Sequence, residues 1–152
     1  MSITYIGGDL FEGIKAARKP LLIPHVCNDA GRWGKGFVLD LGRHFPLAKK
    51  IYSETPSHRL GEVKIVLVSK GIYVANMIAQ HGVGGVRPLR YSALVDCMGT
   101  VRGRWSRERG GIHAPMFGAG LGGGNWNFIE ALIQEIWCDA GYSVTVYRKG
   151  GQ

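Results

Sequence analysis

The stretch "IHAPMFGAGLGGGNW", residues 112–126, decides the fold class of this 152-residue chain. Its first six residues are apolar except for His113 and end in a turn, as a short buried strand does. Five glycines follow within residues 118–124, and a helical pattern begins just beyond them. A strand, a tight loop and a packed helix in succession form the repeating unit of an α/β layer fold. The glycines are either a plain connection or a backbone surface that touches a ligand.

The helix after this loop has the clearest pattern in the chain. Asn127 is the predicted N-cap, and Glu130 stands three residues later, as in a capping box. Gly141 is the predicted stop. The apolar residues repeat at helical spacing and predict one buried face, formed by Ile129, Leu132, Ile133, Ile136 and Trp137.

Working outward, strands and helices alternate along the whole chain. Predicted strands cover residues 3–6, 21–27, 62–69, 72–79, 112–117 and 142–147. Residues 36–52 predict two short helices broken at Pro46, because proline lacks the amide proton that a helix interior needs. Residues 91–101 predict a further helix with Ser92 as its N-cap. This order predicts a mixed, largely parallel sheet with helices on both faces.

The loops after Cys27, Ala79 and Phe117 form the expected functional edge, since ligands of such sheets bind beyond the carboxyl ends of the strands. The glycine-rich loop of residues 117–123 can aim successive N–H groups at a phosphate. It lacks the Gly-Lys-Ser/Thr of a phosphate-binding P-loop. Residues 81–91, "HGVGGVRPLRY", predict a mobile surface loop.

A second loop, "HVCNDAGRWGKGF" at residues 25–37, also leaves a strand and enters a helix through glycines. Together the two loops could hold a diphosphate from both sides. Asn28 and Asp29 could instead serve as ordinary turn residues, because both side chains bond local backbone readily. Asp9, in "IGGDLF", is either the N-cap of a short helix or an acceptor for the amino group of a base.

Composition predicts one compact domain over residues 1–152, with 45% hydrophobic and 20% charged residues. No apolar run approaches the roughly 20 residues of a membrane span, and no signal peptide is evident. A cytoplasmic protein without membrane contact is therefore expected. Cys27, Cys97 and Cys138 are widely spaced, which predicts reduced thiols rather than a zinc site or a disulfide framework. Neither a metal nor a cofactor is predicted.

The net charge of +8 favours anionic partners, either a phosphate-bearing small molecule or nucleic acid. Its densest run is "VRGRWSRERG", residues 101–110. Four arginines without a nucleic-acid-binding motif are a weak footprint, so a solvated loop or helix end is the simpler interpretation. A basic nucleic-acid-binding protein nevertheless stays open as an alternative.

Five blocks in order resemble the macrodomain family of ADP-ribose-binding modules. The resemblance is to the branch that contains terminal ADP-ribose protein glycohydrolase and many bacterial and phage macrodomain proteins. It covers nearly the whole chain, which makes it far more specific than one glycine run. The blocks are "ITYIGGDLF", "HVCNDAGRWGKGF", "YVANMIAQHG", "APMFGAGLGGGNW" and "VTVY".

The resemblance implies a three-layer α/β/α macrodomain with ADP-ribose across the strand ends. Asp9 would hold the adenine amino group, Leu10 would add a backbone contact, and Tyr147 would lie near the adenine. Residues 28–36 would face the distal ribose and the diphosphate. The ligand-binding residues implied in the two loops are Asn28, Gly34, Lys35, Gly36, Phe117, Gly118, Ala119, Gly120, Leu121, Gly122 and Gly123.

Two positions depart from that branch, whose catalysis looks to depend on a lysine and an aspartate. Gln80 and Gly122 stand at the matching places, so no lysine adduct with the opened ribose is available. Hydrolysis would then use an oriented water. Asn28 and Gln80 could orient it, and Asp29 or His81 could accept its proton.

The sequence thus predicts a hydrolase acting on ADP-ribose 1″-phosphate or on an ADP-ribosyl group of a macromolecule. A non-catalytic reader of ADP-ribose is the alternative, and the oligomeric state is not predicted. Two histidines inside strand patterns, His25 and His113, are expected to pack rather than react. His25 could share a face with Cys27, but cysteine catalysis is the weaker interpretation, because a reactive thiolate requires a lowered pKa.

Overall fold

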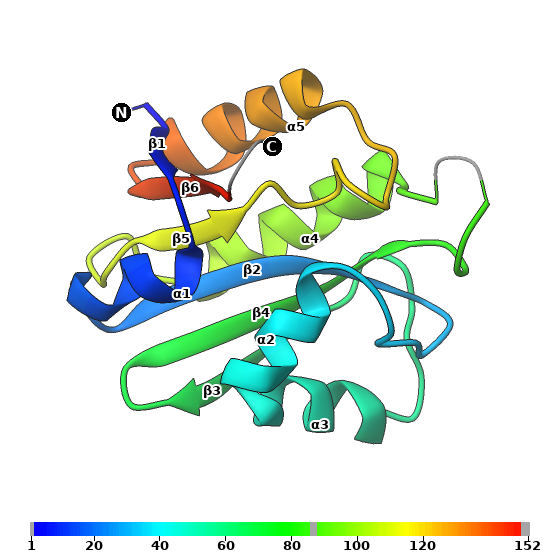
Figure 1. Ribbon diagram of the computed structural model, residues 1–152. Helices are drawn as coiled ribbons and strands as arrows, with labels where there is room; N and C mark the ends of the chain where they lie inside the picture. Colours follow the sequence, from blue (N-terminus) through cyan, green and yellow to red (C-terminus); the bar gives the residue numbers. More distant parts are fainter. Residues whose placement is uncertain (1, 86–87, 150–152) are drawn as a thin grey trace.

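The fold of this chain is a six-stranded sheet between two layers of helices, seen in a computed structural model that describes residues 2–85 and 88–149 (Figure 1). The strands lie in the order β1-β6-β5-β2-β4-β3. The elements are β1 (Thr4–Gly7), α1 (Leu10–Gly13), η1 (Ile14–Ala16), β2 (Leu21–Asn28), α2 (Phe37–His44), α3 (Pro46–Glu54), β3 (Val63–Ser69), β4 (Ile72–Gln80), α4 (Tyr91–Arg104), β5 (Ile112–Pro115), α5 (Trp126–Ile133), η2 (Gln134–Cys138) and β6 (Val144–Arg148).

All neighbouring strands are parallel except β3, which pairs antiparallel with β4 at one edge. The carboxyl ends of β1, β6, β5, β2 and β4 therefore meet along one side of the sheet. The predicted α/β/α architecture with a mixed, largely parallel sheet is confirmed. The predicted break at Pro46 is also confirmed, since this residue begins α3 where its missing N–H costs nothing.

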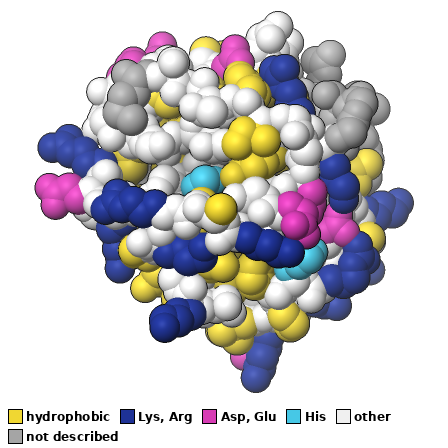
Figure 2. All heavy atoms as spheres, turned by 60° about the vertical axis from the view of Figure 1, so that its left-hand side comes forward, with side chains coloured by type: hydrophobic (Ala, Val, Ile, Leu, Met, Phe, Trp, Pro, Cys, Tyr) yellow, Lys and Arg dark blue, Asp and Glu magenta, His cyan; other side chains and the backbone are white. Residues whose placement is uncertain are grey.

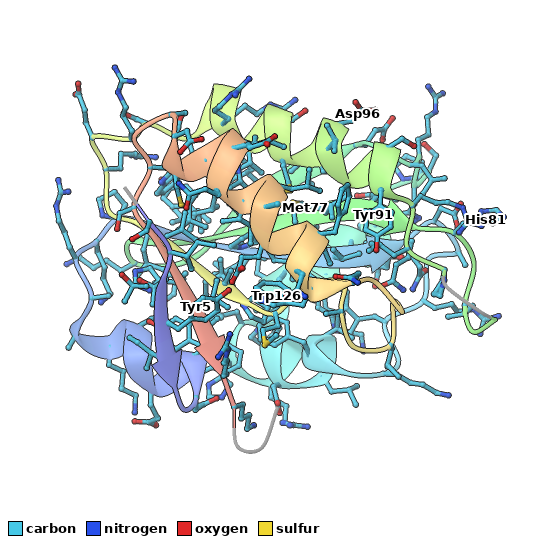
Figure 3. All side chains as sticks on the ribbon, turned by 90° about the horizontal axis from the view of Figure 1, so that it is seen from above. Tyr5, Met77, His81, Tyr91, Asp96 and Trp126 are labelled. Carbon is cyan, nitrogen blue, oxygen red and sulfur yellow. The ribbon has the colours of Figure 1, made fainter. Side chains whose placement is uncertain are left out.

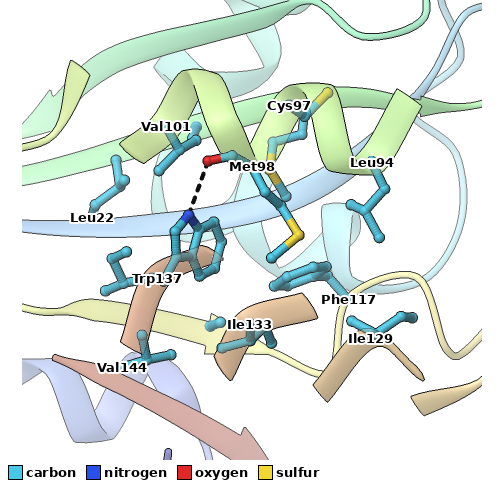
Figure 4. Close-up of a cluster of buried hydrophobic side chains, with 14 of the residues drawn as sticks. Leu22, Leu94, Cys97, Met98, Val101, Phe117, Ile129, Ile133, Trp137 and Val144 are labelled. Carbon is cyan, nitrogen blue, oxygen red and sulfur yellow. Dashed lines mark hydrogen bonds between the residues drawn. The ribbon is translucent and has the colours of Figure 1, made fainter. Parts of the chain in front are cut away.

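The larger core lies between the sheet and the layer formed by α4, α5 and η2 (Figure 4). Trp137 is fully buried there, and its indole N–H donates to the carbonyl of Met98 at 3.0 Å, so the ring pins the end of the α5–η2 helix to α4. A second core on the opposite face packs α1, α2 and α3 against β2 and β4, through residues such as Leu21, Leu41 and Val74. Burial on both faces explains why β2 and β4 are nearly continuous apolar runs.

Two helix starts differ from the sequence prediction. The N-cap of α5 is Asn125, not Asn127, and its side chain accepts from Phe128 N at 3.1 Å. The predicted capping box is wrong, because Glu130 accepts a hydrogen bond from the hydroxyl of Tyr5 instead. Likewise α4 starts after Arg90 rather than at a Ser92 cap.

Three further observations concern the predicted 81–91 loop, the helices and the cysteines. Part of the predicted 81–91 loop lies outside the described residues. Within residues 2–85 and 88–149, no helix combines the length and apolarity that crossing a bilayer requires. The three cysteines are free and buried.

Candidate functional site

A cavity of about 610 Å³ lies along the carboxyl ends of the parallel strands. Each of the loops that follow β1, β2, β5 and β6 contributes to it, together with the last residue of β4. The residues lining this cavity, here called the cleft, are Gly8, Asp9, Leu10, Phe11, His25, Val26, Lys35, Gly36, Phe37, Val38, Asp40, Gln80, Pro115, Met116, Phe117, Gly118, Gly120, Leu121, Gly122, Tyr147 and Lys149.

Asp9 and Tyr147 belong to one end of the cleft, because β1 and β6 are neighbouring parallel strands. Asp9 stands at the N-cap position of α1, but its carboxylate makes no capping hydrogen bond. The carboxylate is therefore available to a ligand. Tyr147 is buried, and its hydroxyl is hydrogen-bonded to His113 Nδ1 at 2.8 Å. A methyl group on Gly13 would lie 2.4 Å from the Tyr147 ring, so this glycine lets α1 pack directly on the tyrosine.

The loop between β5 and α5 presents unused backbone donors. Among the described residues, no hydrogen bond uses the amide N–H of any residue from 118 to 122. The loop is held in shape from below, where Gly124 N donates to Gly118 O at 2.8 Å and Gly123 N donates to Gly120 O at 3.1 Å. Gly118 has φ +78°, which a side chain would strain. Successive free N–H groups in such a loop suit an anion.

The loop before α2 faces it across the cleft. Gly36 has φ +79° and precedes the first turn of α2, which has no side-chain cap. Leu39 N donates to Gly36 O at 3.1 Å, and the N–H groups of Phe37 and Val38 add a second positive end to the cleft. A methyl group on Gly36 would lie 3.2 Å from Leu121 Cδ1, so the two loops nearly touch over the cleft. Lys35 adds a positive side chain to the same wall.

Gln80 and Gly122 face each other at the end of β4. A Cβ added to Gly122 would lie 3.2 Å from Gln80 Oε1 and 2.8 Å from the carbonyl oxygen of Gly118. The loop thus has no room for an aspartate at position 122 without moving. No hydrogen bond within residues 2–85 and 88–149 uses the Gln80 carboxamide. Of the four predicted catalytic residues, Gln80 lines the cleft and has a free polar group, whereas Asn28, Asp29 and His81 do not line it.

Asn28, by contrast, holds its own loop in shape. Its Oδ1 accepts from the amides of Ala30 and Arg32, each at 3.1 Å, and its Nδ2 donates to the carbonyl of Arg32 at 2.7 Å. The buried hydroxyl of Tyr52 donates to the Asn28 backbone oxygen at 2.6 Å. The side chain is 9% exposed and does not line the cleft. These contacts are those of a turn residue, the role that the sequence offered for Asn28 as an alternative to ligand binding.

Asp29 and His81 form a pair that ties two loops together outside the cleft lining. His81 Nδ1 donates to Asp29 Oδ2 at 2.8 Å, and Gly82 N donates to Asp29 Oδ1 at 2.7 Å. Burial would raise the pKa of Asp29, but the bonds from Gly82 and His81 outweigh it and hold the pKa below its usual range. Figure 3 shows His81 at the margin of the molecule, on the loop after β4.

His25 forms part of the cleft floor but is committed to packing. Asn76 Nδ2 donates to Ala48 O at 3.2 Å, so Asn76 Oδ1 is the acceptor for His25 Nε2–H. Burial lowers the pKa of His25 to about 4, and burial also raises the pKa of the adjacent Cys27 thiol. A neutral thiol is a poor nucleophile, so Cys27 is a weak candidate for catalysis. In the described ranges, no group of three His, Cys, Asp or Glu side chains could hold a metal ion.

The loops predicted from the sequence contribute to the cleft, but some predicted residues do not line it and some neighbouring residues do. Of the predicted ligand-binding residues, Asn28, Gly34, Ala119 and Gly123 do not line the cleft. The lining residues that were not predicted from the sequence mostly adjoin predicted ones along the chain, so extending each loop by two residues would have found several. They are Gly8, Phe11, His25, Val26, Phe37, Val38, Asp40, Pro115, Met116 and Lys149.

The comparisons with known proteins agree with this geometry, although no family model matches the sequence. A macrodomain protein from Streptomyces coelicolor is 37% identical, with a TM-score of 0.81 over 98% of this chain and 100% of that one. This chain belongs to the macrodomain family. A second solved structure, of a protein from Bacteroides thetaiotaomicron, is 35% identical, with a TM-score of 0.88 over 97% of this chain and 99% of that one.

Several curated relatives of this macrodomain carry an enzyme name. The ADP-ribose 1″-phosphate phosphatase of Lodderomyces elongisporus is 39% identical over 64 residues. The match spans 40% of this macrodomain and 40% of that relative. The chain therefore covers less than half the length of this enzyme.

Proposed function

We propose that this macrodomain binds ADP-ribose along the cleft. The observation that carries the proposal is the sequence of chemistries from one end of the cleft to the other. Asp9 offers a free carboxylate for the adenine amino group beside Tyr147. The glycine-rich loop, with its unused N–H groups, lies opposite the uncapped start of α2, and a diphosphate would lie between them. Each part of the ligand thus meets a matching surface.

The proposed reaction is hydrolysis of ADP-ribose 1″-phosphate or of an ADP-ribosyl group. The name of the yeast relative supports the first substrate. Gln80 would orient the attacking water from the end of β4, and the amides of the glycine-rich loop would stabilise developing negative charge. Asp29 and His81, hydrogen-bonded to each other outside the cleft lining, are the proposed proton acceptors and would take the proton through a second water. Asn28 would then act indirectly, by holding the shape of the loop that carries Asp29.

Replacing Asp9 with alanine is expected to weaken ADP-ribose binding about 30-fold, since a hydrogen bond to a charged group contributes roughly 1.5–3 kcal/mol. Isothermal titration calorimetry measures the change. Ribose 5-phosphate, which has no adenine, should bind equally to both proteins if it binds at all.

Glu12→Ala is the matched control for Asp9→Ala, because Glu12 is an exposed carboxylate near Asp9 that pairs with Lys15 and does not line the cleft. It should leave the affinity for ADP-ribose unchanged. Equal losses of both ligands in Asp9→Ala would contradict the adenine role. Failure of the unaltered protein to bind ADP-ribose at millimolar concentration would overturn the whole proposal.

Replacing Gln80 with alanine is expected to lower the rate of phosphate release from ADP-ribose 1″-phosphate about tenfold, the value of about one hydrogen bond to the reacting water. The Kd for ADP-ribose should change little. Asn127→Ala, which removes an exposed carboxamide from α5, is the control. A parallel loss of rate and binding would assign Gln80 to ligand binding only.

A non-catalytic reader is the second candidate. It is favoured by the internal hydrogen bonds of Asn28 and Asp29, which leave Gln80 as the free catalytic candidate in the cleft. Tight binding of ADP-ribose without release of phosphate, and without release of ADP-ribose from modified protein or nucleic acid, would establish the reader.

A further inference from the structure

One group of exposed cations lies on the side of the sheet away from the cleft. We propose that this surface, here called the basic edge, binds the phosphate backbone of duplex nucleic acid. It consists of Arg18, Lys19, Lys70, Arg102, Arg107 and Arg109, all exposed. Figure 2, which brings forward the side where β2 and β5 begin, shows Lys and Arg side chains outnumbering Asp and Glu.

Tertiary contacts bring these residues together from four segments. Arg18 donates to the carbonyls of Glu108 at 2.8 Å and Arg109 at 3.2 Å. A Cβ on Gly71 would meet the Lys19 side chain at 3.0 Å, which places the β3–β4 turn and its Lys70 against the same segment.

The last turn of α4 joins them through the segment before β6. Arg107 donates to the carbonyl of Ala140 at 3.3 Å, and the Tyr142 hydroxyl donates to the carbonyls of Arg102 and Trp105. The starts of β2, β4 and β5 therefore share one cationic border.

The basic edge has an excess of positive charge, and some of its side chains are held in place. The Lys19 ammonium donates to the carbonyls of Ile14, Lys15 and Ala17. Segments 18–20, 69–73, 102–110 and 139–143 contain two carboxylates, Glu108 and Asp139, against seven cations, namely the six of the basic edge and Arg104, which donates to the carbonyl of Val63. Asp139 accepts from Gln134. The guanidinium of Arg109 lies 5.2 Å from the ring centre of Tyr73 and 4.8 Å from that of Trp105. Arginine held in this way loses less side-chain entropy when it binds a phosphate.

The surroundings of these cations favour a hydrated polyphosphate over a membrane. None of the exposed large hydrophobic residues lies in the four segments, all of which are described, so nothing there could insert into a bilayer. Trp105 and Tyr142 are buried and Tyr73 lies beneath Arg109, so no ring is free to stack on a base. What remains is sequence-independent contact with backbone phosphates, as on duplex DNA.

The position of the basic edge leaves the cleft open. The cleft lies at the carboxyl ends of the parallel strands, and the basic edge lies at the starts of β2, β4 and β5. A duplex could therefore be held while the cleft is empty or occupied.

Fluorescence anisotropy with a labelled 20-base-pair duplex, from 50 to 200 mM salt, tests the proposal. The unaltered protein should bind at 50 mM with an affinity that falls steeply with salt. The variant Lys70→Gln, Arg102→Gln, Arg107→Gln should bind at least tenfold more weakly at 50 mM, and its salt slope should be smaller by about three, roughly one for each lost phosphate contact.

The control Lys49→Gln, Lys50→Gln, Arg59→Gln removes the same charge from exposed positions on and after α3. It should lose less than threefold. An equal loss in both triple variants would overturn the proposal in favour of net charge alone, as would tighter binding to phosphatidylserine vesicles than to the duplex.

Calorimetry with ADP-ribose checks the cleft in every variant, so failure here is distinct from failure of the proposed function. The charge reversal Lys70→Glu, at an exposed turn, gives a single-site test if the triple variant does not fold. It should lower duplex affinity more than Lys49→Glu does, and an equal effect of both would overturn the proposal.

Discussion

Replacing Gly110 with alanine is expected to lower the free energy of unfolding by about 3 kcal/mol, at the upper end of the usual overpacking range. A Cβ at this position would lie 2.3 Å from the carbonyl oxygen of Pro20 and 2.4 Å from that of Arg18. Both are backbone atoms, so no side chain can turn aside to make room. The segment before β2 would have to move away from the loop before β5. Urea unfolding followed by circular dichroism measures the loss.

The matched control is Gly103→Ala, only seven residues earlier. Gly103 lies in the last turns of α4, and a Cβ there would meet nothing within 4 Å. Because alanine has the higher helix propensity, this variant should be more stable by up to about 1 kcal/mol. Opposite signs at the two glycines would attribute the loss at Gly110 to the close backbone contact. A loss below 1 kcal/mol in Gly110→Ala would contradict that close contact.

Acid is expected to remove a contribution of about 2–3 kcal/mol that neutral His25 makes to stability, because burial lowers its pKa from 6.5 to about 4. The pKa of His25 is about 4 in the folded protein, because burial opposes the charged ring, against 6.5 in the unfolded chain. Between these values the unfolded chain binds more protons than the folded one. Stability from this group is therefore complete above about pH 6.5 and falls as the pH drops toward 4.

The variant His25→Gln isolates this effect from that of the carboxylates. Glutamine keeps a donor for Asn76 but does not titrate. The difference in unfolding free energy between the unaltered protein and the variant should be larger at pH 7 than at pH 4.5, by about 2–3 kcal/mol. Urea unfolding at the two pH values measures it. A difference independent of pH would show that His25 is charged or solvated in the folded state.

Local patterns were sufficient for most of the fold. The strands and helices were predictable within a few residues because hydrophobic spacing and breakers such as Pro46 act on near neighbours. The cap of α5 was not. Asn125 and Asn127 have the same chemistry, and the tertiary contact in which Asn125 N donates to the Tyr91 hydroxyl could not be predicted from local sequence.

For the candidate site, too, some features were predictable from the sequence and others were decided by the tertiary structure. The sequence alone determined that glycine-rich loops follow β2 and β5, that Asp9 follows the first strand, and that Tyr147 lies near the end of the last. Which of these groups face the cleft was decided by tertiary structure. Asn28 turned inward to its own loop, whereas Gln80 kept a free carboxamide opposite Gly122.

The physical reason is the separation along the chain. Backbone conformation and the loop-forming role of glycine depend on a few adjacent residues, so the sequence by itself determined the order of elements and the amide-rich loops. The pair of Asp29 with His81 joins positions 52 residues apart, and the contact of Arg18 with Arg109 joins positions 91 apart. Only the packed sheet brings such groups together, and it alone decided the shape of the cleft and of the basic edge.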